Sequence, residues 1–272
     1  MHKYTSVSID SADGYSLHCR YWAASTPKAL AILQHGVVSH SGWLDKVCAG
    51  LQNSGISCVA MDRRGAGENH EAKGDVPSSG ALFDDLDAVL EWCSSKRLPI
   101  HACGFCWGAN YWVNYLATKD NHVLSLALIA PSLFPSALIK EQTLTLGDSP
   151  NADQRPLIPI ECFTDGPYFR DLIEPDPLRL RLVSTRFNQT MAEFSQAVWM
   201  KVLRLKTPLL VALASNDTVV DNDATRKVVE RFTGAPKMLI ELPGMHGIQF
   251  DACDDLVDHL SDWILKHANK KT

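Results

Sequence analysis

The sequence Gly-Phe-Cys-Trp-Gly at residues 104–108 places one cysteine between two glycines, where an apolar run (residues 100–105) gives way to a helical pattern (residues 107–118). A nucleophile at a sharp strand-to-helix turn needs small neighbours, because its own backbone is strained and larger side chains two residues away would collide. The following helix directs backbone N–H groups and its positive dipole end toward Cys106, which favours thiolate over thiol. The pattern predicts a nucleophilic thiol at Cys106; the alternative is an ordinary buried cysteine.

Strand and helix patterns alternate on both sides of this turn. The chain opens with two segments of alternating polarity around a Ser-Ala-Asp-Gly turn, which predict a β-hairpin. The later strands are near-continuous apolar runs, as expected when helices cover both faces of a parallel sheet. We expect the hairpin at residues 4–10 and 15–22, strands at residues 29–36, 56–62, 100–105, 123–130, 208–215 and 237–244, and helices at residues 44–54, 80–96, 107–118, 222–233 and 252–268. The predicted fold class is α/β, a mostly parallel doubly wound sheet with an N-terminal antiparallel hairpin.

The alternation breaks between residues 132 and 206, where prolines and turns surround short helical patches. This stretch is too rich in proline for β-α-β units, yet apolar enough to pack. Since ligands of open α/β sheets bind at the carboxyl ends of the strands, we expect residues 132–206 to form an inserted helical lid over that edge. The core domain is then expected to comprise residues 1–131 and 207–272.

Composition narrows the classes of function. The chain has 272 residues, 46% of them hydrophobic, and a net charge of −5, which gives no reason to expect nucleic acid as a partner. No window approaches 18 uninterrupted apolar residues, and the N-terminus lacks the apolar core of a secretory signal, so we expect a cytoplasmic protein without a membrane span. No zinc-type spacing stands out, and neither a metal nor an organic cofactor is expected. The oligomeric state stays open.

The eight cysteines lie mostly in apolar runs of a chain too large to need disulfides, so reduced thiols are expected. Cys103 and Cys106 form one Cys-x-x-Cys pair, which keeps a redox motif as an alternative. The context of the pair, a strand followed by a nucleophile-type turn, favours a nucleophile instead.

Two later loops supply the base and acid that such a nucleophile requires. Asp217 follows the apolar run at residues 208–215, and His246 follows the run at residues 237–244. A lone aspartate there is more often a helix cap, and a lone histidine more often a surface residue. Their joint placement, with Cys106 at the carboxyl edge of one sheet, predicts a catalytic set in the order nucleophile, acid, histidine.

The segment LQHGVVSHSGW (residues 33–43) follows the first strand that we expect to be parallel. We predict that the backbone N–H groups near Val37 and of Trp107 bind the substrate oxyanion. His35 and His40 are tempting as additional bases, although a histidine beside such a loop is more often structural.

Aromatic residues of the lid and of the nearby loops indicate an apolar substrate of moderate size. Most lid aromatics, Phe163 among them, are expected to pack within the lid itself. The residues predicted to contact the substrate are His35, Trp43, Tyr168, Phe169 and Phe187.

Five ordered motifs resemble those of the lysophospholipase and monoacylglycerol-lipase-like branch of the α/β-hydrolases, over nearly the whole chain. They are HGVVSHSGW (residues 35–43), MDRRGAGEN (61–69), GFCWGA (104–109), SNDTVVDN (215–222) and PGMHG (243–247), and the lid run DPLRLRLVSTRF (176–187) is also similar. The resemblance implies the α/β-hydrolase fold with Cys106, Asp217 and His246 as the catalytic set. Cys106 replaces the usual serine, and Asn69 stands where the branch commonly has the serine of its glycine segment.

A thiol nucleophile widens the chemistry that this resemblance implies. A thiol beside His246 and a helix terminus can be a thiolate before the substrate arrives, and its acyl product is a thioester open to water, thiols, amines or carbanions. We predict a cysteine-dependent enzyme that hydrolyses or transfers the acyl group of an ester or thioester of a mainly apolar small molecule, carrier-bound substrates and natural-product (polyketide-type) biosynthesis included.

Two alternatives keep the same residues. In the first, His246 removes a proton and the enzyme eliminates a carboxylate such as acetate from an O-acylated substrate, as in tetronate-type pathways. In the second, the protein binds a ligand without catalysis; the competent residue types at Cys106, Asp217 and His246 argue against it.

Overall fold

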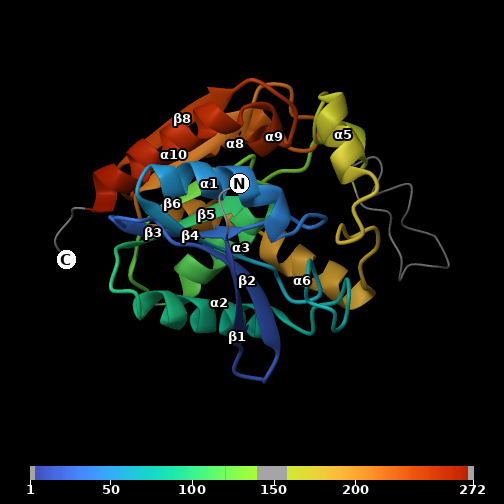
Figure 1. Cartoon of the computed structure of the whole chain (residues 1–272). Coiled ribbons are helices and arrows are strands. Elements are labelled where there is room, and N and C mark those ends of the chain that lie inside the picture. Colours follow the sequence, from blue (N-terminus) through green and yellow to red (C-terminus); the bar gives the residue numbers. More distant parts are fainter. Residues whose placement is uncertain (1–3, 120, 140–157, 269–272) are drawn as a thin grey trace.

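The computed structural model describes residues 4–119, 121–139 and 158–268. These residues form an eight-stranded sheet in the order β1-β2-β4-β3-β5-β6-β7-β8 (Figure 1). The strands are β1 (Thr5–Asp10), β2 (Ser16–Trp22), β3 (Ala29–Gln34), β4 (Ile56–Met61), β5 (Ile100–Phe105), β6 (Val123–Ile129), β7 (Leu209–Ala214) and β8 (Lys237–Leu242). β2 pairs antiparallel with β1 and with β4, and the other neighbouring pairs are parallel. The predicted fold class, with its N-terminal hairpin, is confirmed.

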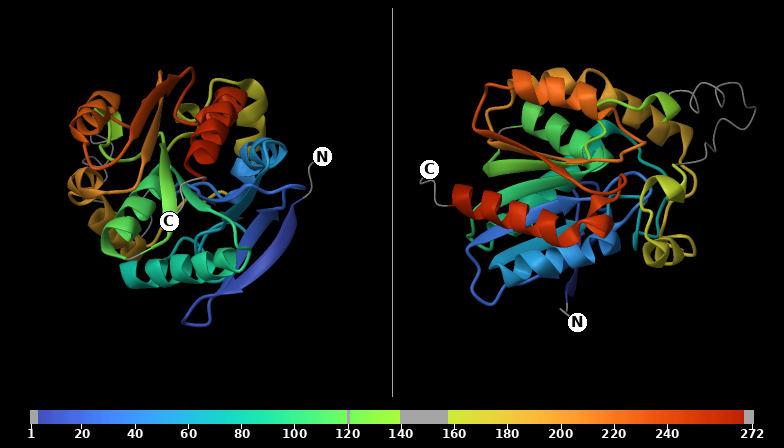
Figure 2. Two further views of the ribbon diagram at one scale, coloured as in Figure 1. Left: turned by 90° about the vertical axis from the view of Figure 1, so that its left-hand side faces the viewer. Right: turned by 90° about the horizontal axis from the view of Figure 1, so that it is seen from above.

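Helices cover both faces of the sheet (Figure 2). On one face lie α1 (Asp45–Asn53) and α10 (Cys253–Ala268), and on the other lie α2 (Ser79–Ser94), α3 (Trp107–Thr118) and α8 (Asn222–Arg231). The remaining described elements are η1 (Ser41–Leu44), η2 (Ile160–Cys162), α5 (Pro167–Ile173), α6 (Thr185–Ser195), α7 (Val198–Arg204) and α9 (Ile248–Asp251). Because both faces are covered, every residue of β3, β4, β5 and β7 is buried, which explains their continuous apolar sequences.

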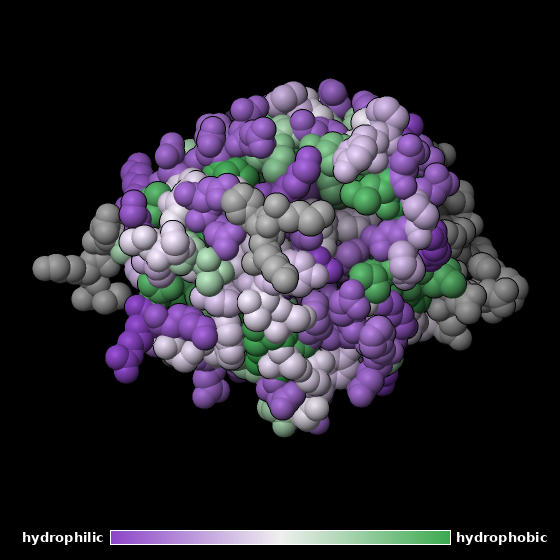
Figure 3. All heavy atoms as spheres, in the orientation of Figure 1, coloured by the Kyte–Doolittle hydropathy of each residue, from purple (hydrophilic) through white to green (hydrophobic). Residues whose placement is uncertain are grey.

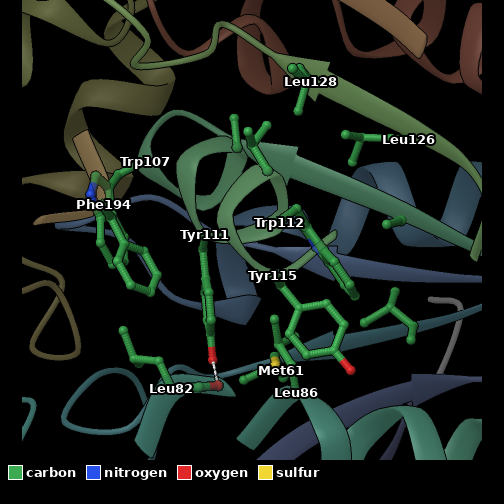
Figure 4. Packing of buried hydrophobic residues seen from close by; sticks show 14 of the residues in the cluster. Met61, Leu82, Leu86, Trp107, Tyr111, Trp112, Tyr115, Leu126, Leu128 and Phe194 are labelled. Carbon is green, nitrogen blue, oxygen red and sulfur yellow. Dashed lines mark hydrogen bonds between the residues drawn. The ribbon is translucent and has the colours of Figure 1, made fainter. Parts of the chain in front are cut away.

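Aromatic side chains pack around the helix that follows Cys106. In Figure 4, Tyr111 of α3 reaches across to α2 and donates its hydroxyl to the carbonyl of Leu82, while Trp107 stacks on Phe194 of α6. The ring centroids of that aromatic pair lie 5.5 Å apart. These contacts fix α3, and with it the turn that carries Cys106, against both the core and the chain that joins β6 to β7.

The chain between β6 and β7 leaves the sheet, and we call its described part the lid segment. Its described part contains η2, α5, α6 and α7, and Figure 1 shows α5 and α6 at one end of the molecule. Residues 140–157 of the predicted lid lie outside the described residues.

In the part of the chain that is described, no helix combines the length and the apolar character needed to cross a bilayer. The face shown in Figure 3 is mainly hydrophilic, with hydrophobic residues scattered over it.

Candidate active site

Cys106 occupies a sharp turn between β5 and α3. Its backbone angles, φ 52° and ψ −119°, are uncommon for a residue other than glycine. Close packing explains the glycines on either side: a Cβ on Gly104 would lie 2.6 Å from Cα of Ala109, and one on Gly108 would lie 2.3 Å from the carbonyl oxygen of Gln34. The structure therefore has the strand–turn–helix geometry that the motif predicts.

His246 and Asp217 form a buried pair at the same edge of the sheet. Asp217 lies beyond the end of β7 and His246 beyond the end of β8. Nδ1 of His246 donates to Oδ2 of Asp217 at 2.8 Å, which leaves Nε2 as the ring atom for proton exchange. The backbone N–H groups of Val219 and Val220 donate to the other carboxylate oxygen, at 2.8 and 3.1 Å. Asp217 is thus held in one orientation, and it fixes the orientation of the imidazole.

The charge of His246 is set by its surroundings. Burial disfavours the imidazolium, but electrostatic attraction to Cys106 and Asp217 outweighs burial and raises the pKa of His246 to about 10. The hydrogen bond to Asp217 raises the pKa of His246 further, whereas Nε2 makes no hydrogen bond within the described residues. The imidazole of His246 is therefore positively charged at neutral pH, and it lies next to the side chain of Cys106.

The loop after β3 passes directly beside Cys106. A Cβ on Gly36 would lie 3.0 Å from Cβ and 3.5 Å from Sγ of Cys106. Val37, the next residue, lines the same cavity as Cys106. Trp107 is the first residue of α3, so its backbone N–H has no acceptor within the helix. The two predicted oxyanion donors, Val37 and Trp107, therefore belong to the segments that flank Cys106.

A small apolar cavity lies beside Cys106 and His246. Its volume is about 20 Å³, room for about one water molecule. Trp43 lines it, as predicted for a substrate-contacting residue, and the ring centroid of Phe163 lies 5.6 Å from that of Trp43. The described lining consists of Gly36, Val37, Val38, Ser39, Trp43, Phe105, Cys106, Ile129, Ile158, Phe163, His246 and Gln249. The lining suits an apolar group of a substrate.

His35 does not line this cavity. The side chain is fully buried; its Nδ1 donates to the carbonyl of Gly36 at 2.7 Å, and its Nε2 accepts from the backbone N–H of Arg63 at 3.0 Å. Burial, the largest cause, lowers the pKa of His35 to about 3, so the ring is neutral. Both ring nitrogens are committed to the backbone, and His35 supports the loop rather than contacting a substrate.

The three predicted lid contacts also lie away from the cavity lining. Tyr168 of α5 is 68% exposed, whereas the neighbouring Phe169 packs against Phe250 at a centroid distance of 5.2 Å. Phe187 of α6 is fully buried against Trp107, with centroids 5.6 Å apart. Phe187 and Phe169 thus serve the packing between the lid segment and the core.

Sequence reasoning missed several residues that line the cavity. Phe163 was not distinguishable from the packing aromatics of the lid, because only its position beside the His246 loop separates it from them. The short helix α9 brings Gln249 to the cavity, and nothing in the local sequence pattern distinguishes this residue. Ile158 likewise has no distinguishing sequence pattern.

The two thiols of the Cys-x-x-Cys pair lie in different surroundings. Cys103 is fully buried in the cluster beneath α1 and α10, and burial raises its pKa, whereas Cys106 borders the cavity. All eight cysteines are free thiols. The described residues contain no group of three or more histidine, cysteine, aspartate or glutamate side chains suited to a metal ion.

Asn69, the second departure from the family motif, joins the ends of a buried turn. Its Nδ2 donates to the carbonyls of Asp62 and Arg63, at 2.8 and 3.1 Å, and its Oδ1 accepts from the backbone N–H of His18 at 2.8 Å. An amide can donate and accept at these separated points at once. The side chain of Asn69 therefore ties the turn to β2.

The sheet order, the strained turn at Cys106 and the buried histidine–aspartate pair define the class of the α/β-hydrolases. A family model described as serine aminopeptidase, S33, matches residues 25–252. The chain belongs to this family of hydrolases.

Known relatives agree with this assignment. Phospholipase YtpA of Bacillus subtilis is 22% identical over 220 residues, covering 78% of this chain and 84% of that protein. Human monoglyceride lipase is 31% identical over 127 residues, but the match spans only 44% of this chain and 41% of the human enzyme. A soluble variant of the monoglyceride lipase of Saccharomyces cerevisiae, solved with a substrate analog, shares the fold with a TM-score of 0.83 at 17% identity, over 99% of this chain and 96% of that chain.

Gly108→Ala should destabilise the fold, because its Cβ would meet the carbonyl oxygen of Gln34 at 2.3 Å. Overpacking of this kind costs about 1–3 kcal/mol. Gly80→Ala in α2 is the matched control, since its Cβ would meet only Oγ of Ser78 at 3.6 Å and alanine favours a helix by about 1 kcal/mol. Urea unfolding measures both; equal stabilities of the two variants would contradict the packing argument.

His246→Asn should slow alkylation of Cys106 by iodoacetamide at pH 7 by about tenfold or more, because an unpaired thiol is mostly protonated there. The raised pKa of His246 keeps the imidazolium charged until the pH rises through about 10. The difference between wild type and variant should therefore be largest at low pH and vanish near pH 10. The alkylation rates of both proteins are measured by intact mass between pH 6 and 10. Equal rates at pH 7 would argue against an ion pair between Cys106 and His246.

Proposed function

We propose that the protein is a cysteine-dependent enzyme that hydrolyses or transfers the acyl group of an ester or thioester of a mainly apolar small molecule. In this proposal Cys106 attacks the acyl carbonyl, His246 transfers protons and Asp217 orients His246. The backbone N–H groups of Val37 and Trp107 hold the oxyanion. The proposal rests above all on the 2.8 Å bond between His246 and Asp217 beside a cysteine held at a strained turn.

The first half-reaction forms a thioester. The Cys106 thiolate attacks the carbonyl carbon, and the carbonyl electron pair moves to the oxygen, where the N–H groups of Val37 and Trp107 stabilise it. When the tetrahedral intermediate collapses, the C=O bond reforms and the bond to the leaving group breaks. Nε2 of His246 gives its proton to the departing alkoxide or thiolate. The result is an acylated Cys106, a neutral His246 and a free alcohol or thiol.

The second half-reaction releases the acyl group. His246 removes a proton from the acceptor, which attacks the thioester carbonyl and forms a second oxyanion. That proton transfer restores the imidazolium of His246, and collapse of the intermediate breaks the C–S bond and expels the Cys106 thiolate. Water as acceptor gives a carboxylic acid, whereas another nucleophile gives a transferred acyl group.

The proposed substrate class draws on the cavity and on the relatives. The walls beside Cys106 are apolar, with Trp43 and Phe163 among them. Relatives are named phospholipase and monoglyceride lipase. A place in natural-product biosynthesis, a carrier-bound substrate and a cytoplasmic location are part of the proposal, the last because reducing surroundings keep thiols free.

Incubation with a 4-nitrophenyl ester should add one acyl group to the wild type, and Cys106→Ala should add none, because in this proposal the thioester forms on Cys106. The adduct is counted by intact-mass spectrometry. Cys253→Ala is the matched control, since it removes a thiol from α10 that does not border the cavity. An adduct that persists in Cys106→Ala would remove Cys106 from the nucleophile role.

Product analysis on an O-acylated substrate with an acidic C–H separates hydrolysis from elimination. Alcohol plus carboxylate indicates hydrolysis, whereas an alkene plus carboxylate indicates that His246 acts as the base of a lyase.

A further inference from the structure

Arg63 is a buried cation that makes no hydrogen bond to a carboxylate within the described residues. Its side chain is fully buried; Nη1 donates to the carbonyl of Gly36 at 3.0 Å and Nη2 to the carbonyl of Val37 at 3.2 Å. Burial lowers the pKa of Arg63 to about 10, so the guanidinium stays charged at neutral pH. A buried charge is costly unless its surroundings compensate for it, so this arrangement needs an explanation beyond the stability of the fold.

The two carbonyls belong to the loop that faces Cys106. In a trans peptide unit the C=O and N–H bonds point in opposite directions, so the direction of the Gly36 carbonyl sets the direction of the Val37 N–H. The Gly36 carbonyl accepts from two donors, Nη1 of Arg63 and Nδ1 of His35. Both donors lie on the side of the peptide opposite the Val37 N–H. They hold that N–H in one orientation and polarise it further.

The same guanidinium contacts the second predicted oxyanion donor and the lid segment. It lies 5.7 Å from the ring centroid of Trp107 and 4.5 Å from that of Phe187 in α6. The backbone N–H of Arg63 donates to Nε2 of His35 at 3.0 Å. Arg63 therefore links the oxyanion loop, the first residue of α3 and the lid segment through one rigid planar group.

The neighbouring Arg64 shows what an arginine with a purely structural role looks like in this turn. It is also buried, but its Nε donates to Asp85 at 2.7 Å and its Nη1 donates to Asp13 at 2.8 Å. Two carboxylates compensate its charge. Asp62 attracts Arg63 without a hydrogen bond to it, and the groups that the guanidinium contacts are carbonyl oxygens and aromatic rings.

We propose that Arg63 is a positioning residue for catalysis: it holds the Gly36–Val37 peptide so that the Val37 N–H points at the developing oxyanion. The inference rests on the proposed function, because it concerns the oxyanion formed when Cys106 attacks an acyl carbonyl. The inference predicts that substitution of Arg63 slows acylation of Cys106, because acylation needs the oriented N–H. Alkylation of the same thiol develops no oxyanion, so its rate should not depend on this N–H.

The test compares Arg63→Met and Arg63→Lys with Arg64→Lys as the matched control. Two rates are measured on each protein by intact mass: acylation of Cys106 by a saturating 4-nitrophenyl ester, and its alkylation by iodoacetamide. We expect acylation to fall about 10- to 100-fold in Arg63→Met and less in Arg63→Lys, with little change in the half-saturating ester concentration. Alkylation should stay near the wild-type rate, which also shows that the variants are folded around Cys106. Arg64→Lys should retain both rates.

The outcomes separate this inference from the proposed function. If the wild type is acylated and Arg63→Met is acylated equally fast, Arg63 has no positioning role and the proposed function stands. If both rates fall together in both Arg63 variants, Arg63 acts on the fold or on the thiol itself, and the inference is overturned. If the wild type is alkylated but never acylated, the proposed function fails and the inference fails with it.

Discussion

The close contact between β3, β5 and the start of α3 is the constraint on which the rest of the site depends. Gly108 lies against the backbone of Gln34, so a side chain there would displace the backbone. Gly36 lies against the side chain of Cys106, so a side chain there would press on the thiol. This packing holds Cys106 at a positive φ that an isolated chain would leave. The strained backbone lies at the turn from which the thiol projects. Burial of the strands on both sides of this turn offsets the energetic cost of that strain.

Buried polar groups around this contact fix the loops that meet there. Asp62 is the centre of one such set: its carboxylate accepts from the backbone N–H of Ser41 at 2.7 Å and of Glu68 at 2.9 Å. Together with the hydrogen bonds of His35 and Arg63, these bonds make the loop after β3 and the turn after β4 one connected unit. Such a network specifies a single arrangement because each buried group left without a partner carries a desolvation cost.

Backbone hydrogen bonds join the lid segment to the loop that carries His246. The N–H of His246 donates to the carbonyl of Cys162 at 3.1 Å, and the N–H of Gly247 donates to that of Phe163 at 2.7 Å. From the other side, Nε1 of Trp43 donates to Asp176 at 2.8 Å. The cavity beside Cys106 is thus bounded by residues whose positions depend on the lid segment, which couples access to the thiol with the placement of His246.

The sequence alone determined the α/β fold, the strand–turn–helix motif at Cys106 and the order of Asp217 and His246. Apolar periodicity and glycine spacing are local properties of the chain, so they can be recognised in the sequence without knowledge of the tertiary structure. Only the tertiary structure decided which aromatics border the thiol and what the buried polar residues do. Trp43 and Phe163 line the cavity whereas Phe187 does not, although all three are aromatic residues. His35 is excluded from the cavity lining because both of its ring nitrogens bind backbone groups. Those distinctions arise from contacts between segments far apart in the chain, which no local pattern encodes.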